Sequence, residues 1–97
     1  MIIYCKYLEF TGHAIRQMFS RQISDMEVRD VINNGEVIME YPDDKPLPSK
    51  LILGFSAGRP IHVVLAYNAA TETGYVITAY IPDTKLWTSD FKTRRKP

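Results

Sequence analysis

The chain has 97 residues, of which 45% are apolar and 24% are charged. This length and composition fit a single soluble globular domain over residues 1–97, and they exclude a disordered chain. The formal net charge of +1 excludes a polycation, so any contact with nucleic acid must come from a local basic patch.

The N-terminal segment MIIYCKYLEF contains Cys5, the one cysteine of the chain. A single cysteine excludes an internal disulfide and a cysteine-based zinc site, and it fits a reducing cytoplasm. The segment lacks the basic start, long apolar run and small-residue cleavage site of a signal peptide. No stretch approaches the ~18 apolar residues of a membrane span. The sequence therefore predicts a cytoplasmic protein that does not contact a membrane.

Two helices are predicted in the first third of the chain. Thr11 is a suitable N-cap for a helix over residues 12–20. The residues SDME begin at Ser24 and have the pattern of a capping box, which predicts a second helix over residues 25–34. Gly35 can then adopt the left-handed conformation that ends many helices.

Four strands are predicted after the helices, over residues 36–41, 50–57, 60–68 and 74–81. Their close spacing and short turns favour an antiparallel meander. Pro82 ends the last strand, and the segment after it is expected to hold a short helix before a basic tail. The predicted fold class is therefore α+β, with the two N-terminal helices packed on one face of a four-stranded antiparallel sheet and with a short C-terminal helix.

Alternation along the strands predicts which face of this sheet lies under the helices. The residues expected on that face are Leu51, Leu53, Phe55, Ile61, Val63, Leu65, Tyr67, Tyr75, Ile77, Ala79 and Ile81. The opposite face, which carries His62 and Tyr80, is smaller and more polar, so we expect it to be open for binding. If the last hairpin is symmetric about Thr71, His62 lies opposite Tyr80.

The chain contains, in order, the motifs HAIRQMFSRQIS, NNGEVIMEYPDD, PSKLILG, RPIHVVLAY, VITAYIPD and LWTSDFKTRR. Together they resemble a bacterial domain-of-unknown-function family that is grouped with the RelE and BrnT toxins of toxin–antitoxin systems. The resemblance spans residues 13–94 and implies a RelE-like fold, with the helices first and the sheet after them. It also implies a toxin that cleaves RNA without a metal ion, and a small cognate antitoxin of zinc-finger or helix-turn-helix character.

RNA cleavage without a metal ion needs a base for the 2′-OH, an acid for the leaving 5′-oxygen and cations for the phosphorane. The candidate catalytic residues are His13, His62 and Tyr80. A local role on the helix surface for His13, and packing roles for His62 and Tyr80, are the structural alternatives.

Arginine side chains are the candidate RNA contacts, because a guanidinium can hold a phosphate through two parallel N–H donors. The candidates are Arg16, Arg21, Arg59, Arg94 and Arg95. Each could instead be a solvated surface residue, and an acidic antitoxin could cover the basic tail. The carboxylates of Asp43, Asp44 and Asp83 do not match the pattern of a metal site, so neither a metal nor another cofactor is predicted.

The leading interpretation is the toxin of a type II toxin–antitoxin pair, acting as a metal-independent ribonuclease on mRNA. Its partners would be the antitoxin and RNA, either on the ribosome or away from it. The alternative is a non-catalytic protein-binding module without nuclease activity, in which the small sheet face and the aromatic C-terminal segment bind a protein. The net charge of only +1 favours this alternative.

Overall fold

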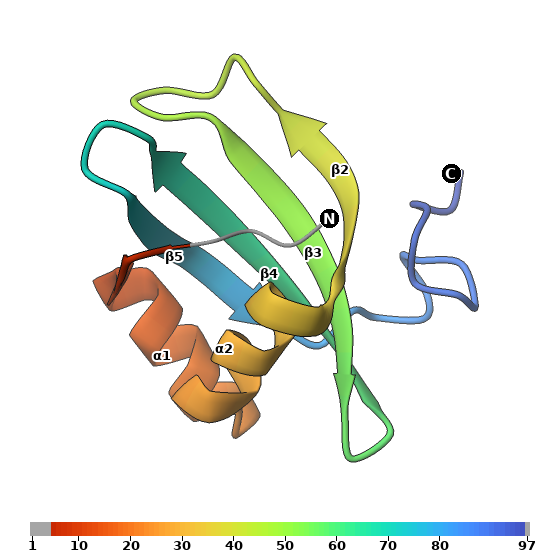
Figure 1. Cartoon of the computed structure of the whole chain (residues 1–97). Helices are drawn as coiled ribbons and strands as arrows, with labels where there is room; N and C mark the ends of the chain where they lie inside the picture. The colour runs from red at the N-terminus through yellow and green to blue at the C-terminus, as the bar shows by residue number, and fades with distance from the viewer. Residues whose placement is uncertain (1–4, 97) are drawn as a thin grey trace.

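The computed structural model describes residues 5–96, which form two helices and five strands (Figure 1). In chain order the elements are β1 (Tyr7–Phe10), α1 (Gly12–Arg21), α2 (Asp25–Asn34), β2 (Glu36–Tyr41), β3 (Ser49–Ser56), β4 (Arg59–Asn68) and β5 (Thr73–Tyr80). Residues 1–4 and 97 lie outside the described residues, and they include the start of the segment assessed above for a signal peptide. Within the described chain, neither helix is long and apolar enough to cross a membrane.

The strands of the described chain form one mixed sheet in the order β1-β5-β4-β3-β2. Strands β2 to β5 are antiparallel neighbours, whereas β1 runs parallel to β5, with Tyr7 opposite Thr73 and Phe10 opposite Val76. The prediction of a four-stranded antiparallel sheet is therefore wrong. A parallel pair needs a long crossover between its strands. Here the crossover comprises both helices and three strands, so no local pattern indicates the pairing of β1.

The prediction of a C-terminal helix is also wrong, because residues 82–96 of the described chain contain turns and one isolated bridge instead. The N–H groups of Leu86 and Trp87 both donate to the Asp83 carbonyl at 2.9 Å, and Trp87 then pairs with Arg94 in an antiparallel bridge. Phe91 has a φ of 62°, in the left-handed region that a right-handed helix cannot accommodate. Trp87 and Phe91 are spaced four residues apart, as on one side of a helix, but they lie in a loop that folds back on itself.

Both predicted N-terminal helices are present, and α2 has the predicted bounds. Thr11 Oγ1 accepts the Ala14 N–H at 3.0 Å, and α1 then extends to Arg21, one residue beyond the predicted end. The capping box of α2 is complete, with the Glu27 N–H donating to Ser24 Oγ at 3.1 Å and the Ser24 N–H donating to Glu27 Oε1 at 2.9 Å. Local capping therefore defines where each helix begins.

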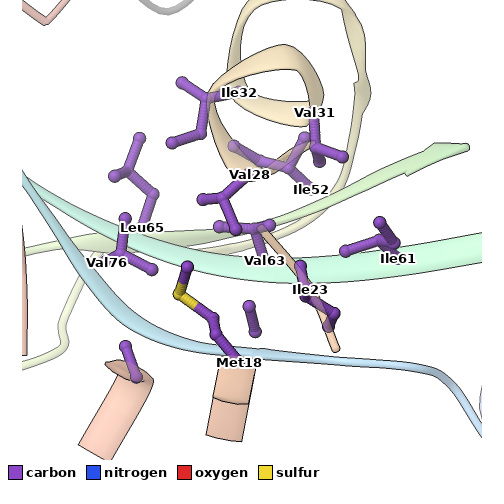
Figure 2. Close-up of a cluster of buried hydrophobic side chains, with 12 residues drawn as sticks. Met18, Ile23, Val28, Val31, Ile32, Ile52, Ile61, Val63, Leu65 and Val76 are labelled. Atoms are coloured by element: carbon purple, nitrogen blue, oxygen red, sulfur yellow. The ribbon is translucent and has the colours of Figure 1, made fainter. Parts of the chain in front are cut away.

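The hydrophobic core lies between the helices and one face of the sheet (Figure 2). Its buried residues are Ala14, Met18, Ile23, Val28, Val31, Ile32, Ile52, Ile61, Val63, Leu65, Val76 and Ala79. Figure 2 shows Val28, Val31 and Ile32 projecting from α2 toward the strands. Removal of these aliphatic side chains from water is the main favourable contribution to folding.

The predicted faces are wrong for β3. Ile52 and Gly54 lie under the helices, whereas Leu51 and Leu53 lie on the opposite face. A Cβ atom on Gly54 would lie 2.7 Å from Val31 Cγ2, so α2 packs directly onto this glycine. Because β3 is apolar on both faces, alternation of apolar and polar residues could not distinguish them.

The predicted faces are also partly wrong for β5. A bulge shifts the register of β4 and β5 after Val64. As a result Val76 and Ala79 are buried in the core, while Tyr75 and Ile77 line a cavity on the opposite face of the sheet. The extra residue lies in β5, and it reverses the alternation of inward and outward side chains between the two ends of this strand.

The C-terminal segment, residues 82–96, covers part of the sheet face that lies opposite the helices, which we call the outer face. The ring of Trp87, which is only 4% exposed, lies 4.5 Å from the ring of His62. The ring of Phe91 lies 6.2 Å from that of Phe55. The expectation of an open outer face is therefore wrong where this segment docks, because its aromatic side chains bury themselves there. In Figure 1 the segment runs in blue on the side away from the helices.

Arg59, at the start of β4, joins the two helices to the sheet. Its Nη1 donates to the Arg21 carbonyl at 3.0 Å, and its Nη2 donates to the Gln22 carbonyl at 2.9 Å and to the Glu27 carboxylate at 3.2 Å. The pKa of Glu27 is lowered to about 2, mainly by the hydrogen bond from the Ser24 N–H, with Ser56 and Arg59 adding to the effect. The guanidinium of Arg59 is therefore engaged by the helix junction.

We expect Arg59→Met to lower the free energy of unfolding at neutral pH by about 2–3 kcal/mol, because it removes charge-assisted hydrogen bonds from a partly buried site. Since the folded-state pKa of Glu27 is lowered, the stability from its ionised form is present above about pH 4.5 and is lost as the pH falls toward about 2. Urea unfolding measures both effects. The control is Arg29→Met, which removes the exposed pair with Asp25 at 3.5 Å and should cost at most about 1 kcal/mol. If Arg59→Met and Arg29→Met lower the free energy of unfolding equally, Arg59 does not stabilise the junction between the helices and the sheet.

Candidate functional site

A hollow of about 440 Å³ opens between α1, the end of β5 and the C-terminal segment. We call it the basic hollow, and it is lined by His13, Gln17, Arg21, Thr78, Tyr80, Ile81, Asp83, Leu86, Trp87 and Arg94. It brings together four of the residues proposed from the sequence, namely His13, Arg21, Tyr80 and Arg94. Three of them are basic, so the hollow is suited to an anion.

Helix α1 supplies one wall of the basic hollow through a stripe of polar residues. His13, Gln17 and Arg21 are spaced four residues apart, so they lie on one side of the helix. Ala14 and Met18 are buried in the core on another side and thereby fix the rotation of the helix. Both His13 and Arg21 are exposed to solvent and can reach a ligand in the hollow.

Tyr80 connects the basic hollow to His62, which is 0% exposed. The two residues are paired across β4 and β5 as predicted, but the hairpin is not symmetric about Thr71, and the bulge after Val64 brings the pair into register. Tyr80 Oη lies 3.1 Å from His62 Nδ1, and His62 Nε2 lies 2.8 Å from the Phe91 carbonyl oxygen. A carbonyl oxygen can only accept, so Nε2 carries the proton. In the neutral imidazole Nδ1 then accepts a hydrogen bond from the Tyr80 hydroxyl.

The environment keeps both members of this pair uncharged. Burial lowers the pKa of His62, and the Phe91 carbonyl opposes this effect only in part. Burial also raises the pKa of Tyr80, an effect that Tyr41 increases and the positive charge of Arg94 reduces. At neutral pH a protonated phenol therefore donates to a neutral imidazole, while the phenol oxygen retains lone pairs for a ligand in the hollow.

Arg94 is held in the basic hollow by the fold of the C-terminal segment. Its guanidinium lies over the Trp87 ring at 5.5 Å from the ring centre, and the backbones of the two residues form a bridge. Asp83 also lines the hollow, and its Oδ1 accepts the Lys85 N–H at 2.8 Å. The hollow thus has one carboxylate among its basic side chains.

The other sequence candidates lie outside the basic hollow or reach it indirectly. Arg59 is bound at the helix junction, and Arg95 Nε donates to the Thr84 carbonyl at 2.8 Å. Arg16 is exposed on α1 with its guanidinium near Gly12, because a Cβ built on that glycine would lie 3.3 Å from Arg16 Nη1. His62 is buried and contacts the hollow through Tyr80.

Gln17 and Asp83 line the basic hollow but were not among the site residues predicted from the sequence. The signal for Gln17 was its spacing of four residues from both His13 and Arg21. Asp83 had no comparable signal, since its position depends on how the C-terminal segment docks. Within residues 5–96, no group of three or more histidine, cysteine, aspartate or glutamate side chains could hold a metal ion.

Comparison with known proteins places this domain in a family. The family model described as Domain of unknown function (DUF4258) matches residues 10–81. Comparisons with curated proteins and with solved structures gave no match. The matched segment contains His13, Arg21, His62 and Tyr80, whereas Trp87 and Arg94 follow it. Because the match covers well over half of the chain, the protein belongs to the DUF4258 family.

Proposed function

We propose that this protein is the toxin of a type II toxin–antitoxin pair and that it cleaves mRNA without a metal ion. The observation that carries the proposal is the convergence of His13, Arg21, Tyr80 and Arg94 on one basic hollow. The hydrogen bond from Tyr80 to a neutral His62 adds a route for a proton. The motif resemblance to the RelE and BrnT toxins supports the same chemistry, and such a toxin acts in the cytoplasm.

The two arginines of the hollow bind the scissile phosphate. Arg21 approaches from α1 and Arg94 from the C-terminal segment, so the phosphate can be held from two sides. Guanidinium groups match the oxygens of a phosphate and neutralise the charge that grows in the phosphorane. The hollow thereby stabilises the transition state without a divalent cation.

Proton transfer in this proposal uses Tyr80 and His13. The 2′-OH gives its proton to the Tyr80 oxygen while the Tyr80 proton passes to His62 Nδ1, and the 2′-oxygen attacks phosphorus. The Phe91 carbonyl, which accepts from His62 Nε2 at 2.8 Å, partly offsets the cost of the transient imidazolium. His13, in its protonated form, gives a proton to the leaving 5′-oxygen. The products are a 2′,3′-cyclic phosphate and a 5′-OH. His62 does not touch the substrate, so it acts as a positioning residue and a proton acceptor for Tyr80.

Expression of the protein without its antitoxin should arrest bacterial growth and degrade mRNA. We expect His13→Ala and Arg94→Ala each to relieve the arrest, because loss of one such group typically lowers cleavage about 100-fold or more. Arg29→Ala, on the surface of α2 away from the hollow, is the control and should remain toxic. The proposal fails if His13→Ala, Arg94→Ala and the control are equally toxic, or if the wild type is harmless.

A second candidate function is a protein-binding module without nuclease activity. The observation in its favour is a set of exposed apolar side chains on the helices, with Ile15 55%, Phe19 87% and Met26 76% exposed. Ile15 and Phe19 line one hollow together with Phe10, Met18 and Ile23, and a contiguous apolar patch of this kind is typical of a surface that a partner protein covers. In the proposed toxin this partner is the antitoxin, a small zinc-finger or helix-turn-helix protein. The growth assay separates the two functions, because a binding module causes no RNA cleavage.

A further inference from the structure

A larger cavity, of about 520 Å³, lies on the outer face beside the basic hollow. Val64 and Ala66 of β4 and Tyr75 and Ile77 of β5 line it from the sheet, and Leu47 lines it from the loop between β2 and β3. We call it the outer-face pocket. The C-terminal segment, which covers His62, contributes none of its described lining residues.

The outer-face pocket and the basic hollow are neighbours along β5. On β5, Ile77 lines the outer-face pocket and the next residue, Thr78, lines the basic hollow. At the start of α1, Thr11 lines the pocket and His13 lines the hollow. Thr11 Oγ1 donates to the Ile77 carbonyl at 3.0 Å and thereby links the start of α1 to β5 between the two cavities. At ~3.3 Å per residue, Ile77 lies about 10 Å along the strand from Tyr80. A nucleotide adjoining a phosphate in the hollow spans a distance of this order.

The walls of the outer-face pocket suit a flat heterocycle. The sheet contributes the aliphatic side chains of Val64, Ala66 and Ile77 and the ring of Tyr75, and the volume falls in the usual range for small-ligand sites. Unpaired bases bind proteins through contacts of this kind, because every base has an apolar face.

Polar groups of the pocket can distinguish one base from another. Ser49 Oγ donates to Asp44 Oδ2 at 2.6 Å, which holds this carboxylate of the loop against β3. Asn68 Oδ1 accepts the Ala70 N–H at 3.0 Å, so the amide N–H groups of Asn68 are the end that can donate to a ligand. A carboxylate accepts from the amino and imino groups of a base, and an amide donates to its carbonyl or ring nitrogen atoms.

We infer that the outer-face pocket binds an unpaired nucleobase of the RNA strand whose phosphate occupies the basic hollow, and that it sets the sequence preference of cleavage. This inference rests on the proposed ribonuclease function. The proximity of the two cavities along β5, the apolar surface beside Tyr75 and the polar groups of Asp44 and Asn68 together point to this occupant.

Binding of the four ribonucleosides, followed by NMR on the wild-type protein, tests the pocket without any need for cleavage. Since nucleosides lack a phosphate, they report on the base site alone. We expect shift changes at Val64, Ile77 and Asn68, larger for one base than for the others, and loss of the changes at Ile77 and Asn68 in the pocket-filling variant Val64→Phe. If no nucleoside at millimolar concentration shifts these signals, or if Val64→Phe leaves the shifts unchanged, the inference is wrong.

Sequencing of the cleavage ends then tests the role of the pocket in the reaction. We expect the wild type to prefer one base by about tenfold or more, and the ratio of cleavage at that base to cleavage at the other bases to fall in Val64→Phe and Asp44→Asn. Asp44 lies in an exposed loop, and an asparagine there can still accept the hydrogen bond from Ser49. We therefore expect the Asp44→Asn variant to fold even if Val64→Phe does not. Ile15→Phe, an enlarged exposed residue outside both cavities, should keep the wild-type preference.

The two claims fail in different ways. If the wild type cleaves RNA and both pocket variants retain its base preference, the role of the pocket is wrong and the ribonuclease stands. If nothing is cleaved but a nucleoside shifts Val64 and Ile77, the base site stands and its role in cleavage falls together with the ribonuclease.

Discussion

We expect Tyr80→Phe to lower the rate of RNA cleavage by about 100-fold or more, the effect of losing a group that transfers a proton in the transition state. The substitution removes one hydroxyl, which donates to His62 Nδ1 at 3.1 Å and belongs to a residue lining the basic hollow. Phenylalanine keeps the ring and its edge contact with the His62 ring, whose centre lies 5.2 Å away. Single-turnover cleavage of a labelled RNA in the presence of EDTA measures the change.

The matched control is Tyr7→Phe, which removes the hydroxyl of a 56% exposed tyrosine in β1. It should cleave RNA at the wild-type rate. Thermal unfolding of both variants confirms that any loss of rate in Tyr80→Phe does not reflect loss of the fold. If the two variants cleave RNA equally fast, the Tyr80 hydroxyl has no part in the reaction.

The second large effect is on stability. His62→Ala should lower the free energy of unfolding by about 3–5 kcal/mol, the range for removing a fully buried ring. The substitution removes the hydrogen bonds with Tyr80 and the Phe91 carbonyl and leaves a cavity beneath Trp87, whose ring lies 4.5 Å away. Trp87 is the single tryptophan of the chain, so its fluorescence reports the C-terminal segment during urea unfolding. His13→Ala, on the exposed surface of α1, should change stability by at most about 0.5 kcal/mol. Similar losses from the two histidine variants would contradict this account of the buried site.

The stability difference between the wild type and His62→Ala should depend on pH. Because burial lowers the pKa of His62, the unfolded chain binds a proton more readily than the folded chain as the pH falls below about 6.5. The stability that His62 contributes is complete above that pH and is lost progressively below it. The difference between the two proteins should therefore narrow from about pH 7.5 to about pH 5. A difference that widens over this range would show that the buried imidazole carries a charge.

The elements that depend on local rules could be predicted from the sequence. The N-caps at Thr11 and Ser24 defined where the helices begin, and the short turns defined the meander of β2 to β5. These features need only neighbouring residues, so single-sequence reasoning can reach them.

Features that depend on distant partners could not be predicted in this way. Strand β1 forms by pairing with the edge of β5, which lies far away in the sequence. The face of β3 that points to the core depends on the close contact of α2 with Gly54. The bulge after Val64 reverses the faces of β5 with no sign in the sequence pattern. Docking of Trp87 then covers a face that alternation alone leaves open.

The difference between local and distant partners also explains which site residues could be predicted. Residue type and order are enough to make His13, His62 and Tyr80 candidates, but the role of each arginine depends on the residues that surround it in the fold. Arg59 meets Glu27 and the end of α1, whereas Arg94 lies over Trp87 in the basic hollow. Only the folded chain separates an arginine that holds the structure from one that is available to a phosphate.

Incubation of the purified protein with free mRNA in EDTA, and separately with mRNA on ribosomes in magnesium buffer, tests the central claim most directly when the new RNA ends are identified. Attack by the 2′-OH leaves a 2′,3′-cyclic phosphate and a 5′-OH. We expect these ends from the wild type and their loss with Tyr80→Phe and Arg21→Ala. RNA that stays intact in both conditions with the folded wild type, or free RNA that is cut only after a divalent metal is added, would contradict the proposed chemistry of the basic hollow.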